Sequence, residues 1–467
     1  MIKTKTLILG AGPAGLACAM ELYRSSHTFT VVEKDKQVGG LAKTYRFGKF
    51  RTDNGPHRFF SQNKFLYGFI EDLLKEKWIK VNRLTRFYVN GKFYLYPVDW
   101  KNVFHNLGVA GTTKILVDFV LGKLKFINKK PRNFEDYALS TFGKSLAQLN
   151  VFNFNEKIWG LPVGQLSVDW ATQRIKDLTL TSLIKNMVLK KQGPKTLVDQ
   201  FYYPALGTGL IYEEIAKKLV RNPLNKILLS TEPVLLVHQN KVIKEAVLTN
   251  GKRIKFDNLV SSIPIKRLVS ILSPKAPETV MQALVRLKLR SQVYLFLTIN
   301  KEKISDDQWI YFPDRNIPFA RVSEMRNFSG LMSPKGKTSL FIEFFCWEGD
   351  NIWIMDKKSL FDLTIAHLEK LGFVKRSEVI DYYLLKQKDS YPVYDLSYKK
   401  YLKIINDYLA KFSNLIYIGR PGRFKYTNQD HSLEMGIIAA RSIIENKKYA
   451  IDKVGAESKY FERGYLK

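Results

Sequence analysis

The first thirty-odd residues carry a hydrophobic pattern whose period changes twice. Residues 4–9 form a short apolar run that ends in glycine, residues 14–24 repeat apolar side chains at helical spacing, and residues 28–32 form a second apolar run. Short runs rich in β-branched residues predict buried strands, and the 3.6-residue spacing between them predicts a helix. This segment is therefore expected to form a β-α-β unit.

The rest of the chain alternates between helical and β patterns. Residues 64–195 place most of their aromatic, Leu and Ile side chains at helical spacing. Residues 228–264 return to short strands, with Asn250-Gly251 as a hairpin turn, and residues 291–345 hold further short runs typical of an antiparallel sheet. Residues 415–446 begin with a last apolar run and end in a helical pattern. We therefore expect the chain to leave its first fold and return to it twice.

A glycine motif lies at the first strand-to-helix junction. Gly10-Ala11-Gly12-Pro13-Ala14-Gly15 has the spacing G-x-G-x-x-G, which permits a tight turn, close approach of a pyrophosphate and close helix–strand packing. The amino terminus of the following helix supplies free N–H groups for phosphates. Glu33 ends the second run, 18 residues beyond Gly15, where a carboxylate can accept the hydroxyls of a ribose. The unit is thus predicted to bind a dinucleotide.

Further small residues favour FAD over NAD. Gly39-Gly40-Leu41 lies just past the acid, where a loop can close over the pyrophosphate, and Gly419-Arg420 follows an apolar run and precedes a helix. A second helix amino terminus would then lie near the flavin. The candidate FAD-binding residues are Gly10, Gly12, Pro13, Ala14, Gly15, Glu33, Lys34, Gly39, Gly40, Leu41, Gly55, His57, Val234, Gly419, Arg420, Asn428, Gln429 and Ser432.

These patterns predict an α/β protein with a Rossmann-type FAD-binding domain, an inserted helical domain and an antiparallel β-sheet substrate domain. The chain has 467 residues, which is enough for two or three domains with cores of their own. The expected boundaries are 1–65, 205–275 and 410–448 for the FAD-binding domain, 66–204 for the helical domain, 276–409 for the sheet domain and 449–467 for a basic tail.

The charge adds one question about partners. Seventy-five Lys and Arg against 43 Asp and Glu give a net charge of +32, which suits nucleic acid, an anionic membrane surface or polyanionic small substrates, or reflects composition alone. Acids are interleaved and no nucleic-acid module is recognisable, so specific nucleic-acid binding is not expected. The most apolar long segment, 109–127, is interrupted by Lys114, Asp118, Lys123 and Lys125. It cannot cross a bilayer, although it could lie on one.

The two cysteines, Cys18 and Cys346, both fall in apolar runs and are predicted to be buried thiols. With no disulfide framework and no metal-ligand spacing, a reducing cytoplasm is expected, with weak association with a membrane surface left open. The amino terminus runs straight into a strand, which leaves no room for a signal peptide. No metal site is predicted.

Several motifs resemble one flavoprotein superfamily, that of amine oxidases, protoporphyrinogen oxidases and UDP-galactopyranose mutases. Residues 309–321, which read WIYFPDRNIPFAR, are the most specific match and are similar to the mutases, nearer to their eukaryotic type. The other similar segments are 53–60, 170–175, 203–209, 390–392 and 423–432. The resemblance extends in order over most of the chain, but residues 64–150 offer no motif to match.

The resemblance implies roles for individual residues. It places His57 beside the isoalloxazine, arginines and tyrosines on a diphosphate, and an aromatic strand along a sugar pocket. The candidate catalytic residues are His57, Arg174 and Arg321, and the candidate substrate-binding residues are Arg174, Trp309, Tyr311, Arg321, Tyr391 and Tyr426. Arginine suits a diphosphate because its planar fork can hold two oxygens at once.

Each of these residues also has a structural interpretation. Trp309 and Tyr311 would look the same as core aromatics, the tyrosines as packing residues and the arginines as surface or domain-bridging residues. His57 could be satisfied by backbone groups. His431, which follows Asp430 and precedes a helix, is expected to belong to an N-terminal cap network.

Three functions are compatible with the sequence. The favoured one is an FAD-dependent enzyme of nucleotide-sugar mutase type, by resemblance a UDP-galactopyranose/galactofuranose ring isomerisation through N5 of reduced flavin, with UDP-hexose as substrate and NADPH or NADH as reductant. Such enzymes serve cell-envelope polysaccharide synthesis. The second is an FAD oxidoreductase of amine oxidase or protoporphyrinogen oxidase type. The third is a flavin-stabilised binding protein without turnover, and the oligomeric state stays undetermined.

Overall fold

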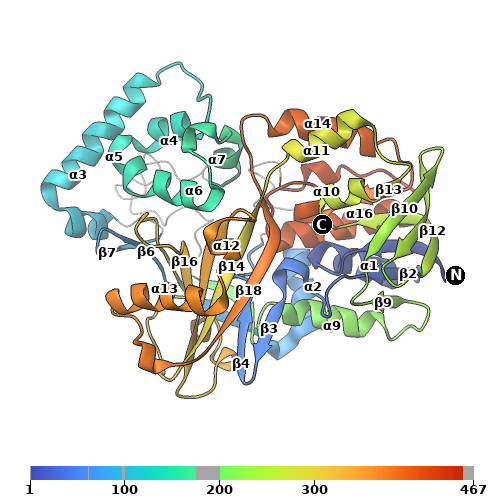
Figure 1. Cartoon of the computed structure of the whole chain (residues 1–467), viewed down its shortest axis with the longest axis horizontal. Helices are drawn as coiled ribbons and strands as arrows, with labels where there is room; N and C mark the ends of the chain where they lie inside the picture. The colour runs from blue at the N-terminus through green and yellow to red at the C-terminus, as the bar shows by residue number, and fades with distance from the viewer. Residues whose placement is uncertain (1, 62, 97–99, 175–199, 456–467) are drawn as a thin grey trace.

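The computed structural model describes residues 2–61, 63–96, 100–174 and 200–455, and for residues 100 and 172–174 it describes the backbone alone. Within these ranges the chain forms an eight-stranded sheet, a seven-stranded sheet and a helical region (Figure 1). The predicted mixed α/β fold is therefore confirmed.

The eight-stranded sheet is built around the first strand. β1 (Ile2–Leu9) pairs in parallel with β2 (Phe29–Val32) on one side and with β12 (Arg253–Ser261) on the other. β9 (Lys226–Leu228) extends the sheet beyond β2, and β19 (Leu415–Tyr417) pairs in parallel with the end of β12. The β-α-β prediction is confirmed, and the carboxyl ends of three parallel strands meet at one edge, where ligands bind in folds of this kind.

An antiparallel extension completes this sheet. β10 (Pro233–Gln239) and β11 (Val242–Leu248) pair with each other and then with the first half of β12, and the short β13 (Leu272–Ser273) lies outside them. The turn from β11 to β12 is at Asn250-Gly251, as predicted, with Gly251 at φ +74°.

Helices cover both faces of the sheet. On one face α16 packs so closely on α1 that a Cβ on Gly436 would overlap the carbonyl oxygen of Ala14. The helices on this face are α1 (Pro13–Arg24), α2 (Lys64–Leu74), α9 (Gly209–Leu219) and α16 (Gln429–Ile444), and those on the other are α10 (Ile265–Ser270), α11 (Glu278–Arg286) and α14 (Tyr398–Leu409).

The seven-stranded sheet is antiparallel apart from one parallel pair, β15 with β6. Its order is β18 (Val379–Pro392), β14 (Leu289–Ile299), β17 (Thr338–Cys346), β16 (Arg321–Glu324), β15 (Trp309–Tyr311), β6 (Thr85–Val89) and β7 (Lys92–Leu95). Helix α13 (Lys357–Lys370) packs its apolar side on this sheet. Shorter elements are β3 (Thr44–Phe47), β4 (Phe50–Asp53), α12 (Asn351–Ile354) and α15 (Gly419–Gly422).

The helical prediction for residues 64–195 was wrong over residues 78–95. That segment holds β5 (Trp78–Asn82), which pairs with β8 (Gln200–Pro204), and then β6 and β7. Residues 85–89 alternate buried and half-buried side chains, and Asn90-Gly91, both at positive φ, forms the hairpin turn. The strands were missed although this turn signal is present, because their aromatic residues were assigned to a helical spacing.

Three helices pack against the eight-stranded sheet although the expected domain boundaries place them outside the FAD-binding domain. Helix α2, expected in the helical domain, packs against the eight-stranded sheet, and α11 and α14, expected in the substrate domain, pack against its other face. Apolar helix faces are buried where a matching sheet face is available, which need not follow the order of the chain.

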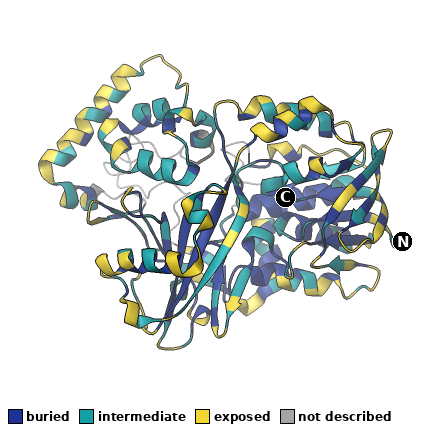
Figure 2. Ribbon diagram, in the orientation of Figure 1, coloured by how far each residue is buried: buried dark blue, intermediate teal, exposed yellow. Residues whose placement is uncertain are grey.

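The helical region forms the end of the molecule farthest from the eight-stranded sheet (Figure 1). It contains α3 (Trp100–Lys125), with a break at Gly108, and then α4 (Phe134–Phe142), α5 (Lys144–Leu146), α6 (Phe152–Trp159) and α7 (Val168–Arg174). Figure 2 shows exposed residues along much of α3. No helix within the described ranges is long and apolar enough to cross a membrane.

Candidate functional site

One large cavity, of about 720 Å³, lies where the two sheets and the helical region meet. Its lining begins at the glycine motif, passes the carboxyl edge of the eight-stranded sheet and ends among aromatic residues of the helical region. The predicted dinucleotide motif and most of the predicted substrate residues therefore face one continuous space.

The glycines of the motif have distinct structural tasks. Gly10 adopts φ +95°, and a Cβ there would lie 2.5 Å from Ser262 Oγ. A Cβ on Gly15 would overlap the Gly10 carbonyl oxygen, so helix α1 can approach β1 only with glycine at this position. Gly12, at the start of α1, has no side chain capping the helix and lines the cavity opposite Gly40. The first N–H groups of α1 are thus available to a phosphate.

Glu33 lies at the carboxyl end of β2, as the motif predicts. Its carboxylate accepts hydrogen bonds from the backbone N–H of Ala11 at 2.7 Å and of Asp35 at 3.0 Å. These bonds fix a buried carboxylate on the cavity wall beside the glycines, where it can accept from ribose hydroxyls. Lys34 lines the same part of the cavity.

The second helix amino terminus predicted near the flavin is also present. Helix α16 begins after Asn428, whose backbone N–H lies 3.3 Å from His431 Nδ1 in a capping arrangement. His431 is therefore part of the cap network, as expected. Gln429 and Ser432, in the first turn, line the cavity.

Buried polar groups without partners mark the space between these two helix ends. Among the described residues, His57 Nδ1 and both side-chain polar atoms of Asn54 have no hydrogen-bond partner. Buried polar atoms are rarely left unpaired, so their position on the cavity wall indicates a polar ligand there. The glycine cradle, Glu33 and these groups fit the dinucleotide and ring of FAD.

His57 is uncharged at neutral pH. Burial and, to a smaller extent, the charges of Arg420 and Arg321 together lower the pKa of its imidazole to about 3. Both arginines line the same cavity as the imidazole and bring positive charge to this part of it.

Arg321, at the start of β16, forms a two-pronged ion pair with Glu343 of β17. Arg321 Nε lies 2.8 Å from Glu343 Oε1, and Nη2 lies 2.6 Å from Oε2. Burial works against the charge of Arg321, but the Glu343 carboxylate outweighs it and raises the pKa of the guanidinium above its ordinary value. The Nε–Nη2 edge of the fork is therefore directed at Glu343, and Arg321 keeps both N–H groups of Nη1 and the second N–H of Nη2 to offer a phosphate.

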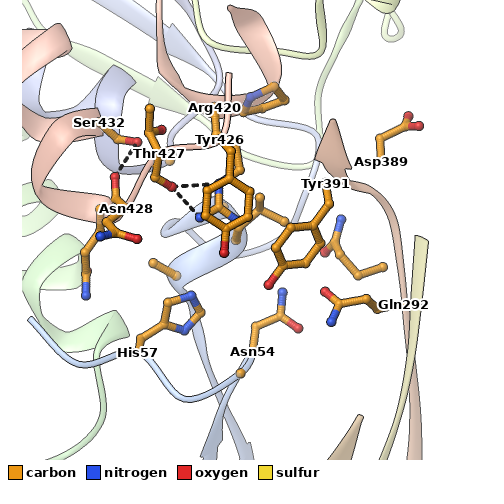
Figure 3. Close-up of a pocket in the computed structure, with 18 of the residues that line it drawn as sticks. Asn54, His57, Gln292, Asp389, Tyr391, Arg420, Tyr426, Thr427, Asn428 and Ser432 are labelled. Carbon is orange, nitrogen blue, oxygen red and sulfur yellow. Dashed lines mark hydrogen bonds between the residues drawn. The ribbon is translucent and has the colours of Figure 1, made fainter. Parts of the chain in front are cut away.

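Two tyrosines and Arg420 form another part of the cavity wall. The rings of Tyr391 and Tyr426 stack with centroids 5.5 Å apart, and the Arg420 guanidinium lies over both, at 5.1 and 4.7 Å from their centroids. Arg420 also donates to the Thr427 carbonyl. In Figure 3 both hydroxyls point toward the side of the cavity that carries His57 and Asn54.

The aromatic strand β15 contributes differently at its two positions. Tyr311 stacks on Phe87 with centroids 4.9 Å apart and carries the Arg321 guanidinium 5.8 Å from its own centroid. Trp309 is 5% exposed and stacks on Phe328 in the core. Both line the cavity, but Trp309 is mainly a core residue, as its structural interpretation held.

Comparison with known proteins agrees with this geometry. A family model described as flavin-containing amine oxidoreductase matches residues 13–444. The chain belongs to this family.

Solved structures share this fold over nearly the whole chain. A crystal structure of reduced UDP-galactopyranose mutase matches 99% of the chain and 100% of its own length, with a TM-score of 0.85 and 21% identity. A putative protoporphyrinogen oxidase from Exiguobacterium sp. 255-15 covers 95% of the chain and 98% of its own length, with a TM-score of 0.72 and 16% identity. The resemblance inferred from the motifs is confirmed, and the chain is a flavoprotein; a closer likeness to the eukaryotic mutases stays a prediction.

Curated relatives match over shorter stretches. A probable UDP-galactopyranose mutase from Klebsiella pneumoniae is 24% identical over 165 residues, which cover 34% of the chain and 42% of that protein. An L-amino-acid oxidase from Crotalus adamanteus is 29% identical over 91 residues, 20% of the chain and 17% of that protein. The chain thus spans less than half the length of these relatives.

Three predicted site residues lie outside the cavity lining, and a fourth cannot be placed. Gly15 packs against Gly10, and Gly39 donates its N–H to the Ala11 carbonyl; neither lines the cavity. Val234 has an exposed side chain outside the lining, which includes the preceding Pro233 instead. Arg174 ends helix α7, but its side chain lies outside the described residues.

Among the polar residues of the cavity wall that sequence reasoning missed are Asn54, Gln292 and Glu343. Gln292 Nε2 lies 3.3 Å from Glu343 Oε2, and Tyr294 donates its hydroxyl to Gln292 Oε1 at 2.7 Å. All three lie within apolar or motif segments, so an isolated polar side chain in a buried strand was the available signal.

Proposed function

We propose that this flavin-containing protein is a nucleotide-sugar mutase, which interconverts the ring forms of a UDP-hexose with its FAD in the reduced form and NADPH or NADH as reductant. The observation that carries the proposal is the wall formed by Arg321, Arg420, Tyr391 and Tyr426 beside His57. It combines two cations and two hydroxyls at the flavin end of the cavity, as a diphosphate requires.

The charge balance of this wall favours an anionic substrate. Glu343 neutralises Arg321, whereas no carboxylate among the described residues pairs with Arg420. One positive charge therefore remains in a partly desolvated space, where attraction to a diphosphate is stronger than in water. Tyr391 supports this binding as a neutral donor, since burial raises the pKa of its hydroxyl above the ordinary value.

The chain's own groups suit binding rather than covalent chemistry. His57 has a pKa of about 3 and is a weak base at neutral pH. Cys18 and Cys346 are buried in packed cores and do not line the cavity. Bound reduced flavin supplies a nucleophilic nitrogen for an isomerisation without net oxidation, and the protein holds the diphosphate and excludes water.

The full-length likeness to reduced UDP-galactopyranose mutase supports this proposal, but the family also contains oxidases, so the redox state provides the test. The reduced, anaerobic protein should interconvert the ring forms of a UDP-hexose over many turnovers per reduction, and the oxidised protein should be inactive. Chromatography of the nucleotide sugars follows the reaction.

Bleaching of the oxidised flavin by an amine or a porphyrinogen, with one acceptor consumed per turnover, would favour the oxidoreductase function instead. A flavin that responds to none of these compounds would favour the binding protein without turnover. Mass spectrometry of small molecules that co-purify with the reduced protein would identify the bound sugar nucleotide.

A further inference from the structure

Exposed apolar side chains are concentrated on one helix. Of the 20 exposed large hydrophobic residues within the described ranges, eight lie between residues 104 and 127, on or just after α3. Six of these are Leu116, Val117, Val120, Leu121, Leu124 and Ile127, whose exposed fractions range from 41% to 58%. Single exposed apolar residues are normal on a protein surface, but a contiguous group marks an interaction site.

The exposed residues that follow the break at Gly108 form a stripe because of their spacing. Leu116, Val120, Leu124 and Ile127 follow one another at intervals of three or four residues, so they lie on one side of the helix. Ile115 and Phe119 are buried on the opposite side. At 1.5 Å per residue, the stripe from Val109 to Ile127 is about 27 Å long.

Positive charge flanks this stripe. Lys114 and Lys125 lie on one side of it and Lys123 on the other, as the 100° rotation per residue requires. The segment that follows α3 adds Lys129, Lys130 and Arg132, all exposed. Long lysine side chains can extend from the edge of an apolar face toward a polar surface.

Negative charge is turned away from the stripe. Asp118 is the one acid between residues 101 and 132. It accepts hydrogen bonds from the backbone N–H and the hydroxyl of Ser145, on the inner side of α3. The outer face of α3 therefore combines a long apolar stripe with cations alone.

We propose that α3 docks this protein on the surface of a bilayer that contains anionic lipids. The apolar stripe then lies at the boundary between headgroups and acyl chains, and the lysines lie at the headgroups. A helix with an apolar face and flanking lysines binds at this depth, parallel to the membrane. A second copy of the chain is the less favourable occupant, because two such faces would bring their lysines together in a molecule of net charge +32.

Docking through α3 would also place the cavity close to the membrane. The inner residues Val103 and Ile115 of α3 belong to the apolar cluster that includes Phe87, Tyr96 and Tyr311, and these three aromatics line the cavity. One helix, about 10 Å in diameter, thus separates the bilayer from the cavity wall. This arrangement does not depend on which reaction the flavin supports.

Vesicle binding of the FAD-loaded, full-length protein tests the proposal. Vesicles of phosphatidylcholine mixed with phosphatidylglycerol should bind the protein more tightly than phosphatidylcholine alone. Val120→Asp/Leu124→Asp should weaken binding by about tenfold or more, because two charges would enter the apolar boundary. The matched control, Leu224→Asp/Val285→Asp, changes the net charge equally at exposed apolar sites far from α3 in sequence, and should bind as tightly as the natural protein.

A fluorescence measurement locates the contact independently. Both natural cysteines are buried, so an environment-sensitive dye on Val120→Cys reports this position, and one on Leu224→Cys serves as the control. A blue shift with mixed vesicles at position 120 but not at 224 supports the proposal.

The proposal is overturned if the natural protein fails to bind mixed vesicles, or if both double variants lose affinity equally, since net charge alone would then explain adsorption. It is also overturned if sedimentation shows a dimer that Val120→Asp/Leu124→Asp separates, because α3 would then join two copies.

Discussion

Removal of Arg321 should expose the cost of an unpaired buried charge. Glu343 is fully buried. Its carboxylate accepts hydrogen bonds from two nitrogens of Arg321 and a longer one from Gln292. Arg321→Ala leaves this carboxylate without its counter-ion. Breaking one side of a buried ion pair costs about 3–5 kcal/mol of unfolding free energy. Arg321→Met/Glu343→Gln removes both charges while preserving most of the volume, and should recover more than half of that loss.

Urea unfolding of both variants at pH 7 measures these changes, with titration of UDP as a second reading. The Arg321→Ala loss should shrink as the pH falls, because an unpaired buried carboxyl can take up a proton and its pKa would lie above that of the unfolded chain. UDP affinity should fall by about tenfold or more in both variants, since each lacks the N–H donors of Arg321 that Glu343 leaves free. The double variant should therefore recover stability without recovering UDP affinity.

Arg376→Ala provides the matched control. Arg376 pairs with Asp362 at 2.8 Å on the surface, with half of its side chain exposed, and its loss should cost at most about 1 kcal/mol. If Arg321→Ala destabilises no more than this control, Glu343 does not depend on Arg321 and the reasoning fails. Unchanged UDP affinity in both Arg321 variants would remove Arg321 from the substrate site.

Three further outcomes follow from single positions. Gly12→Val should give colourless protein because its side chain would enter the pyrophosphate cradle, whereas Gly68→Val, at an open site, should stay yellow; the flavin absorbance decides. Burial raises the pKa of Asp53 to about 7, so the folded state keeps this proton to a higher pH than the unfolded chain does. The free energy of unfolding of the natural protein should therefore fall as the pH rises from about 4 to about 7. Relative to the natural protein, Asp53→Asn should therefore gain up to about 4 kcal/mol across this window, and equal urea midpoints at every pH would contradict it. Lys157 Nζ donates to carbonyls of residues 312–319, so Lys157→Met should lower the free energy of unfolding by about 1–3 kcal/mol and speed hydrogen exchange in this loop. Unchanged exchange would show that the loop keeps its conformation without Lys157.

The cofactor half of the site could be predicted from short stretches of sequence. The glycine motif, Glu33 and the start of α16 each act through the backbone of a few consecutive residues, and parallel strands with helical crossovers bring their carboxyl ends to one edge. Gly15 is fixed by its contact with Gly10, five residues earlier. Such local geometry needs no knowledge of distant partners, which is why the FAD-binding fold and the superfamily followed from the motifs.

The substrate half depends on which strands become neighbours. Arg321 faces Glu343 because β16 pairs with β17 in one register, and a shift by one residue would turn Glu343 to the other face. In the same way β6 joins β15, more than 200 residues away, although its own residues suggested a helix. Pairing energies of this kind come from side-chain packing across the sheet rather than from local preference. The composition could therefore supply arginines, tyrosines and an apolar helix, but long-range packing alone set which arginine is neutralised, which tyrosines stack and which face of α3 remains exposed.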